Sequence, residues 1–184
     1  MDMQDALEDL AIDPKTEVLV ITGAGKAFSA GQDIKLYFRG TATDPAARHK
    51  ARLASNNWRW QQLSRFPKPT IAMVNGYCFG GAFTQVSACD FAFAADDAIF
   101  GLSEVNWGIL PGGIVAWNVS QLMSYRNAIY YGVTGEPFNG KRAVEIGFVN
   151  KSVPKAKLKA EVVKFAQLLM KKSPAAMRYT KECI

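Results

Sequence analysis

The sequence contains few residues that support thiol or metal chemistry. Its 184 residues include three cysteines, Cys78, Cys89 and Cys183, and one histidine, His49. No two cysteines form a CxxC pair, which argues against a disulfide framework and against a zinc site. A single histidine in a polar helical segment also argues against a Cys–His nucleophilic pair. We therefore expect His49 to be a surface residue and the protein to bind no metal.

Long apolar runs and a basic N-terminal region are missing as well. No uninterrupted apolar stretch is long enough to cross a bilayer, and the first residues are acidic where a signal peptide would be basic. We expect a cytoplasmic protein that does not bind membranes. Lysines cluster between residues 151 and 164 in a chain of net charge +6, without interleaved aromatic residues. A solvated helix face explains them best; attraction of a polyanionic small molecule is the alternative, and RNA is less favoured.

Nucleotide-binding and hydrolase motifs are incomplete. Residues 23–26 (GAGK) lack both the spacing of a P-loop and the Ser or Thr that follows its lysine. No GxSxG nucleophile motif is present. A tight turn at the exit of a strand is the better interpretation of residues 23–26.

Hydrophobic periodicity predicts alternating helices and strands. The predicted helices span residues 3–12, 48–65, 114–123, 126–131, 141–146, 155–171 and 174–183. The predicted strands span residues 17–22, 68–75, 90–94, 98–100 and 148–153. This alternation indicates one α/β domain with a largely parallel sheet, and residues 40–45 are the best candidate for a mobile loop.

Two strand-to-helix turns are suited to bind one oxygen atom. One runs through Gly80 and Gly81 after the strand that ends at Asn75, and the other is the loop at residues 28–33. N–H groups at a helix start have no partner within the helix and lie at its positive end, and glycine allows a ligand to come close. Two such N–H groups aimed at one carbonyl oxygen would stabilise an enolate or a tetrahedral anion.

Glu104 is the candidate acid–base residue. It lies among the apolar residues Leu102, Val105 and Trp107, which would desolvate its carboxylate and raise its pKa. The alternative is a surface glutamate in a turn. Gly112 follows in another glycine turn, and its backbone N–H would position a water or hydroxyl near Glu104.

A series of short motifs runs in order along most of the chain. They lie at residues 30–35, 68–72, 75–76, 80–82, 88–90, 100–104, 108 and 111–112. In these motifs the chain resembles the crotonase (enoyl-CoA hydratase/isomerase) superfamily. The resemblance implies a spiral of ββα turns, an acyl-CoA substrate, no cofactor beyond the CoA moiety of that substrate, and homotrimers or dimers of trimers. By position, the two oxyanion-hole N–H groups are those of Gln32 and Gly81.

The resemblance also sets expectations for the extent of the fold. Residues 1–154 would form the crotonase-like spiral core, and residues 155–184 would begin a C-terminal helical region. The opening strand, the first CoA-binding loop and the last helices of the family have no counterpart. We therefore expect a fold truncated at both ends.

Thr84 occupies the position of the first of the two glutamates that ordinary hydratases of this family use. A threonine cannot act as a carboxylate base, which argues against simple two-glutamate hydration. Residues 35–39, 77–81 and 101–109 resemble a subgroup, the hydroxycinnamoyl-CoA (feruloyl-CoA) hydratase-lyases, which keep one catalytic glutamate at the position of Glu104. The implied reaction is hydration of a 4-hydroxycinnamoyl-CoA and retro-aldol cleavage of the product, giving vanillin and acetyl-CoA from feruloyl-CoA.

The subgroup implies a role for each candidate residue. Glu104 would activate water, protonate the α-carbon and assist cleavage, while Thr84 would hydrogen-bond the substrate or the water. Tyr37 would meet the phenol end of the substrate, with a packed aromatic side chain as the alternative, and Trp107 would wall the pocket. The remaining expected binding residues, which act largely through backbone atoms, are Ala30, Gly31, Asp33, Ile34, Lys35 and Gly80.

Two other functions stay open at this point. One is a generic enoyl-CoA hydratase or isomerase that acts on a different acyl group, which product analysis would distinguish. The other is a non-catalytic CoA- or RNA-binding member of the superfamily. The presence of Glu104 together with both glycine turns weighs against a silent protein.

Overall fold

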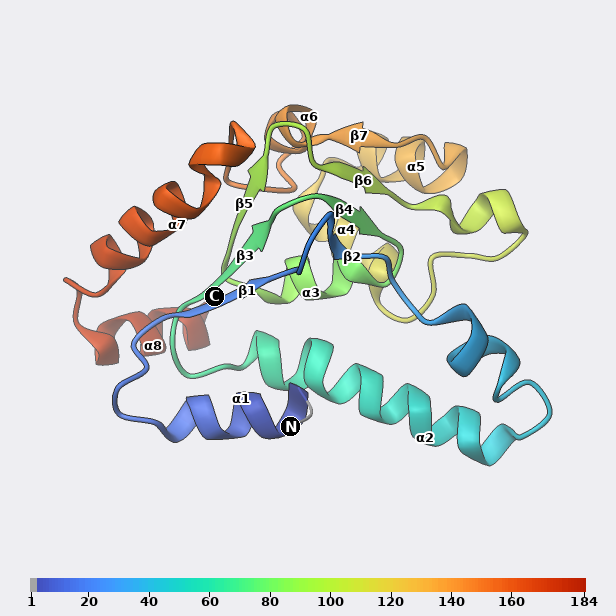
Figure 1. Cartoon of the computed structure of the whole chain (residues 1–184), viewed down its shortest axis with the longest axis horizontal. Coiled ribbons are helices and arrows are strands. Elements are labelled where there is room, and N and C mark those ends of the chain that lie inside the picture. The colour runs from blue at the N-terminus through green and yellow to red at the C-terminus, as the bar shows by residue number, and fades with distance from the viewer. Residues whose placement is uncertain (1–2) are drawn as a thin grey trace.

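Residues 3–184, which the computed structural model describes, form two four-stranded sheets with helices packed around them (Figure 1). The first sheet is entirely parallel and has the order β1 (Leu19–Thr22), β3 (Thr70–Val74), β5 (Phe91–Ala95), β8 (Lys151–Val153). The second has the order β2 (Ala27–Ser29), β4 (Tyr77–Phe79), β6 (Ile99–Gly101), β7 (Phe138–Asn139), and only β7 is antiparallel to its neighbour.

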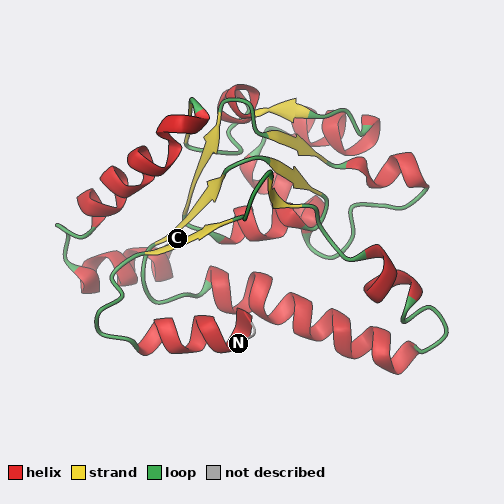
Figure 2. Ribbon diagram, in the orientation of Figure 1, coloured by secondary structure: helices red, strands yellow, loops and turns green. Residues whose placement is uncertain are grey.

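The chain alternates between the two sheets, which produces the expected ββα spiral. A strand of the first sheet is followed by one of the second three times, and helices lead back to the first sheet (Figure 2). The strands are largely parallel, as predicted, but they form two sheets where the sequence analysis had described one. The strands β2, β4 and β6 are three residues long, which is too short to show a period of two.

The helices follow the predicted order; α1 and α8 have the predicted bounds, and the others have shifted ends. Their bounds are α1 (Met3–Ile12), α2 (Pro45–Asn56), α3 (Ala82–Ala88), α4 (Val115–Leu122), α5 (Tyr125–Thr134), α6 (Gly140–Glu145), α7 (Lys155–Leu169) and α8 (Pro174–Cys183). Shorter helical segments are η1 (Ile34–Arg39), η2 (Asn57–Gln62) and η3 (Ser103–Trp107).

The helix predicted from residue 48 begins earlier, within the segment expected to be a loop. Asp44 caps α2 by accepting a hydrogen bond from the N–H of Ala47, and Pro45 takes the first helical position. Residues 40–43 form the turn that precedes this cap. The helix continues directly from α2 into η2, so it extends unbroken across the bottom of Figure 1.

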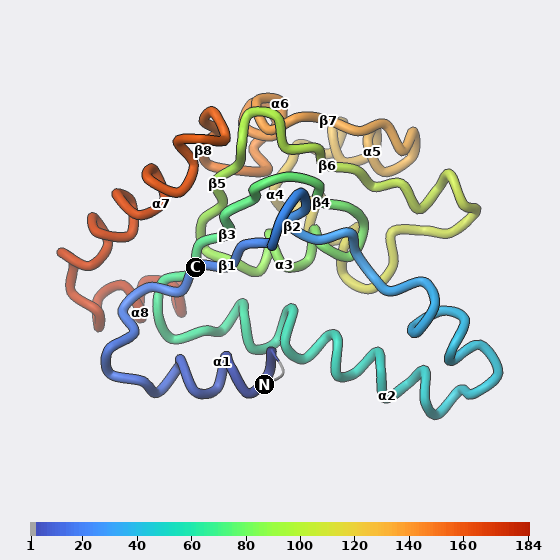
Figure 3. Tube along the Cα trace, in the orientation of Figure 1, coloured from blue at the N-terminus to red at the C-terminus, as the bar shows by residue number. Residues whose placement is uncertain are grey.

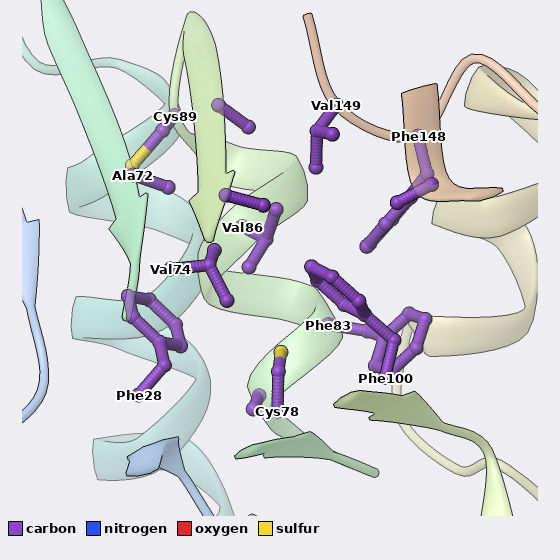
Figure 4. Packing of buried hydrophobic residues seen from close by; sticks show 14 of the residues in the cluster. Phe28, Ala72, Val74, Cys78, Phe83, Val86, Cys89, Phe100, Phe148 and Val149 are labelled. Carbon is purple, nitrogen blue, oxygen red and sulfur yellow. The ribbon is translucent and has the colours of Figure 1, made fainter. Parts of the chain in front are cut away.

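Helix α3 is anchored by a cluster of buried aromatic rings (Figure 4). The Phe83 ring stacks on Phe148 with centroids 4.8 Å apart and meets the edges of Phe100 and Phe138 at 6.2 Å. None of these four side chains is more than 5% exposed. Because α3 follows the Gly80–Gly81 turn directly, this cluster also fixes the position of that turn.

The C-terminal helices pack on the same body as the strands. The Phe165 ring of α7 lies 4.8 Å from that of Phe91 on β5. Lys181 of α8 pairs with Asp90 at 2.7 Å and donates to the carbonyl of Phe66 at 2.8 Å. Figure 3 shows α8 returning close to the start of β1 and β3. Within residues 3–184, no helix combines the length and apolar character needed to span a membrane.

We expect Phe83→Ala to lower the free energy of unfolding by about 3–5 kcal/mol, because it opens a cavity beneath α3. Tyr125→Ala, at a side chain that is 74% exposed, is the matched control and should change that free energy by less than about 0.5 kcal/mol. Urea unfolding measures both. Equal effects of the two substitutions would contradict this description of the core.

Candidate functional site

A cavity of about 800 Å³ joins the turns that the sequence singled out. Segments from residues 32–38, 52–59, 81–84 and 104–115 line it, and Figure 3 shows η1 and the chain after residue 104 both at the right-hand end of the molecule. The expected site residues that it brings together are Gln32, Tyr37, Gly81, Thr84, Glu104 and Gly112. A volume of this size suits a small organic ligand.

The turn between β4 and α3 depends on glycine. Gly80 has φ +53°, and its N–H donates to the carbonyl of Gly101 at 3.0 Å. Gly31 has φ +91°, and a Cβ added there would lie 2.9 Å from the carbonyl oxygen of Phe79 and 3.5 Å from the nitrogen of Gly81. The two loops are therefore in direct backbone contact, which only glycine allows at this position.

The backbone N–H groups of Gln32 and Gly81 are available to a ligand. Within residues 3–184, neither N–H donates a hydrogen bond to a protein acceptor. Gly81 is the N-cap residue of α3, where N–H groups point outward from the helix. Both residues line the cavity, so the arrangement is suited to two donors converging on one oxygen atom.

Glu104 lies against the glycine turn. A Cβ added to Gly80 would come within 2.8 Å of Oε1 of Glu104. The other oxygen, Oε2, is buried and has no hydrogen-bond partner in the described part of the chain. This burial raises the pKa of Glu104, because the charged form loses its hydration. The alternative of a surface glutamate is therefore wrong, and the carboxyl is suited to exchange protons with a ligand.

Thr84 and Tyr37 both line the cavity. Thr84 is 7% exposed and sits in the first turn of α3, behind Gly81. Tyr37 belongs to η1, and its ring meets the edge of Phe38 at 5.0 Å. Each side chain is thus both packed and adjacent to the cavity.

Several expected binding residues lie outside this cavity. Trp107 is 79% exposed and does not line it, so the structure does not support a wall formed by this side chain. Asp33 uses its carboxylate to cap η1, accepting from the N–H of Leu36 at 2.6 Å. The side chains of Ala30, Ile34 and Lys35 are exposed beside it. Their contribution to CoA binding stays a prediction.

Arg59 is the residue that the sequence analysis missed. Its guanidinium donates to Oε1 of Gln32 and to the carbonyl oxygen of Gly81, the latter at 3.4 Å. Burial lowers the pKa of Arg59 by desolvation. Its signal in the sequence is weak: one arginine between Trp58 and Trp60 in a helix. The side chain of Gln32 thus accepts a hydrogen bond in the site, whereas the sequence had pointed to its backbone alone.

Two of the three cysteines, Cys78 and Cys89, are buried, and the histidine is exposed. Burial raises the pKa of Cys89 to about 12 and that of Cys78 further still, so both thiols stay protonated and are poor nucleophiles. His49 is exposed on α2, as expected. Across residues 3–184, no cluster of three His, Cys, Asp or Glu side chains is arranged to hold a metal ion.

Comparisons with known proteins show the family to which the chain belongs. A family model described as enoyl-CoA hydratase/isomerase matches residues 1–184. Hydroxycinnamoyl-CoA hydratase-lyase of Pseudomonas fluorescens is 46% identical over 181 residues, which are 98% of this chain and 66% of that protein. Crotonyl-CoA hydratase of Syntrophomonas wolfei is 35% identical over 182 residues, covering 98% of this chain and 68% of the relative.

A solved structure gives the same result for the fold. An enoyl-CoA hydratase from Polaromonas superposes with a TM-score of 0.90 at 28% identity, over 98% of this chain and 70% of that one. The chain thus spans just under two thirds of the hydratase-lyase and slightly more of the other relatives.

We expect Glu104→Gln to stabilise the protein at neutral pH. The pKa of Glu104 in the folded state lies above its ordinary value of 4.5. The unfolded chain therefore loses this proton first, and the native state loses stability as pH rises through the interval between the two pKa values. Below the ordinary pKa both states are protonated, so the wild type and the variant should converge.

Urea midpoints at about pH 4 and about pH 7 measure this difference. The exposed Glu17 provides the matched control, and Glu17→Gln should leave the midpoint unchanged at both pH values. A Glu104→Gln variant that is less stable than the wild type at neutral pH would show that the carboxylate is not desolvated.

Proposed function

Because the chain belongs to the enoyl-CoA hydratase/isomerase family, we propose that it hydrates a 4-hydroxycinnamoyl-CoA and then cleaves the β-hydroxy thioester. The products would be an aromatic aldehyde and acetyl-CoA. One observation supports this proposal above all: the desolvated carboxyl of Glu104 lines the same cavity as Gln32 and Gly81, whose backbone N–H groups have no protein acceptor within residues 3–184. Thr84 stands in that cavity where a second carboxylate would be expected.

Hydration begins with the thioester oxygen between the N–H groups of Gln32 and Gly81. Glu104 takes a proton from water while the hydroxyl bonds to the β-carbon, and the electrons of the double bond move onto the thioester oxygen as an enolate. The two N–H groups stabilise that charge. Glu104 then returns the proton to the α-carbon. A carboxyl whose pKa is raised can both accept and donate a proton near neutral pH.

Cleavage uses the same groups in reverse order. Glu104 takes the proton of the β-hydroxyl, the bond between the α- and β-carbons breaks, and the aldehyde leaves. The electron pair again becomes an enolate held by Gln32 and Gly81, and protonation of its carbon yields acetyl-CoA. No second carboxylate is needed in either step, which fits a threonine at residue 84.

An aromatic acyl group is favoured by two considerations. Tyr37 lines the cavity, and its phenol can hydrogen-bond a substrate hydroxyl. The Pseudomonas relative at 46% identity is named for a hydroxycinnamoyl-CoA substrate. Crotonyl-CoA hydratase, at 35% identity, makes simple hydration of another acyl-CoA the alternative. A homotrimer or dimer of trimers and a cytoplasmic location remain part of the proposal.

We predict that the purified protein converts 4-hydroxy-3-methoxycinnamoyl-CoA into equal amounts of vanillin and acetyl-CoA. Substrate absorbance and chromatography of the products measure this conversion.

Glu104→Gln should lower kcat by about 100-fold or more while retaining thioester binding, because it removes the only proton carrier proposed. The exposed control Glu17→Gln should match the wild type. Hydrated thioester without aldehyde would instead identify a simple hydratase, and turnover that survives Glu104→Gln would refute the proposed role.

Gly80→Ala tests the position of the Glu104 carboxyl. The added methyl group would lie 2.8 Å from Oε1 and displace it. We expect kcat to fall by about tenfold or more, because misplaced catalytic groups lose much of their effect. Gly25→Ala is a close control: its φ is +69° against +53° for Gly80, but nothing lies within 4 Å of its added Cβ. Equal kcat values for the two variants would contradict the proposed contact.

A further inference from the structure

The guanidinium of Arg59 connects the two turns of the candidate oxyanion hole. Arg59 lies in η2, well separated in sequence from both turns. It donates from Nη2 to Oε1 of Gln32 and from Nη1 to the carbonyl oxygen of Gly81 at 3.4 Å. A further bond from Nη2 to Oγ of Ser55, one helical turn earlier, holds the guanidinium against its own helix.

Gly81 leaves the room that this contact needs. A Cβ added to Gly81 would lie 2.7 Å from Nη1 of Arg59 and 3.8 Å from Oε1 of Gln32. Both side chains therefore lie directly over the glycine. A larger residue at this position would push the guanidinium away, so the glycine serves the contact with Arg59 as well as access for a ligand.

Within residues 3–184, the charge of Arg59 has no anionic partner. None of the ion pairs in the described chain includes it, and the acceptors Gln32, Ser55 and Gly81 are neutral. A partly buried cation is stabilised by hydrogen bonds or by a nearby negative charge. During the proposed reaction, the enolate oxygen would bring such a charge to the turns that Arg59 contacts.

We propose that Arg59 is a positioning residue, which holds the backbone N–H groups of Gln32 and Gly81 at the spacing that one thioester oxygen requires. The inference rests on the proposed function. The bonds of Arg59 run to the side chain of Gln32 and to the carbonyl of Gly81. They therefore fix both residues and leave the two N–H groups to the substrate. The fork of a guanidinium can bridge two acceptors in a way that a lysine ammonium cannot.

The test measures how strongly the bound thioester carbonyl is polarised. The probe is 3-(4-hydroxyphenyl)propionyl-CoA with a ¹³C-labelled carbonyl, which has no double bond to hydrate. Wild-type protein should lower its C=O stretching frequency in difference infrared spectra. Arg59→Met should bind the probe within several-fold of the wild-type Kd yet lose most of this shift, and kcat should fall by about tenfold to 100-fold.

Arg65→Met is the matched control, because Arg65 is exposed just beyond η2. It should leave the shift and kcat unchanged. Arg59→Lys should recover part of the shift, since it keeps the charge but loses the fork. If Arg59→Met fails to fold, Gln32→Met serves as the test, because it removes the acceptor from the other side and should weaken the same shift.

Three results would overturn the inference, and they can be told apart. If folded Arg59→Met or folded Gln32→Met lowers the C=O stretching frequency of the probe as much as the wild type does, the positioning role is excluded and the proposed function is left intact. Combining the two substitutions should cost less than the sum of the single effects, and full additivity would show that the residues act independently. Wild-type protein that binds the probe without any shift would overturn the proposed oxyanion hole itself.

Discussion

The site depends on the absence of side chains at Gly80 and Gly81. An added Cβ would come within 2.8 Å of the Glu104 carboxyl at the first position and within 2.7 Å of the Arg59 guanidinium at the second. An acid–base group and a cation thus approach the same two-residue turn. Gly31 approaches from the loop at residues 28–33, where an added Cβ would lie 2.9 Å from the carbonyl oxygen of Phe79. These close approaches are possible because Gly31, Gly80 and Gly81 have no side chains.

The rest of the fold holds this turn in place. Helix α3 begins at the turn and buries Phe83 among the rings of Phe100, Phe138 and Phe148, which come from β6, β7 and the segment before β8. Side chains from across the chain therefore constrain one helix start. The buried Oε2 of Glu104, with no partner in residues 3–184, is a local cost to stability. Such a cost is common at functional sites, where a useful pKa conflicts with stability.

Much of the fold was predictable because the signals were local. The helix Met3–Ile12 and the buried strands Thr70–Val74 and Phe91–Ala95 have clear hydrophobic patterns, and they lie where the sequence indicated. Of the second sheet only β6 was predicted, as the strand at residues 98–100, since strands of two or three residues carry no periodic signal. The π-helical segment Ile34–Arg39 was likewise not among the predicted helices.

The candidate site was predictable in part, for a related reason. Glycine turns and a carboxylate among apolar residues are local features, so both turns and Glu104 were singled out from the residues, and the family resemblance then pointed to the N–H groups of Gln32 and Gly81. Arg59 was not singled out, because a basic residue in a helix usually marks a solvated face and its partners are 22 and 27 residues away. Trp107 was expected to form a wall of the pocket from the subgroup resemblance, yet its side chain is 79% exposed. Side-chain direction depends on tertiary contacts that a motif does not contain.

The most direct test of this account isolates enolate formation from the identity of the substrate. A saturated acyl-CoA in D₂O can exchange its α-proton only if a base removes that proton while the thioester oxygen is stabilised as an enolate. Proton NMR should show exchange catalysed by the wild-type protein and reduced by about 100-fold or more in Glu104→Gln. Exchange that proceeds equally in both proteins, or in neither although the thioester binds, would contradict the pairing of Glu104 with the Gln32–Gly81 oxyanion hole.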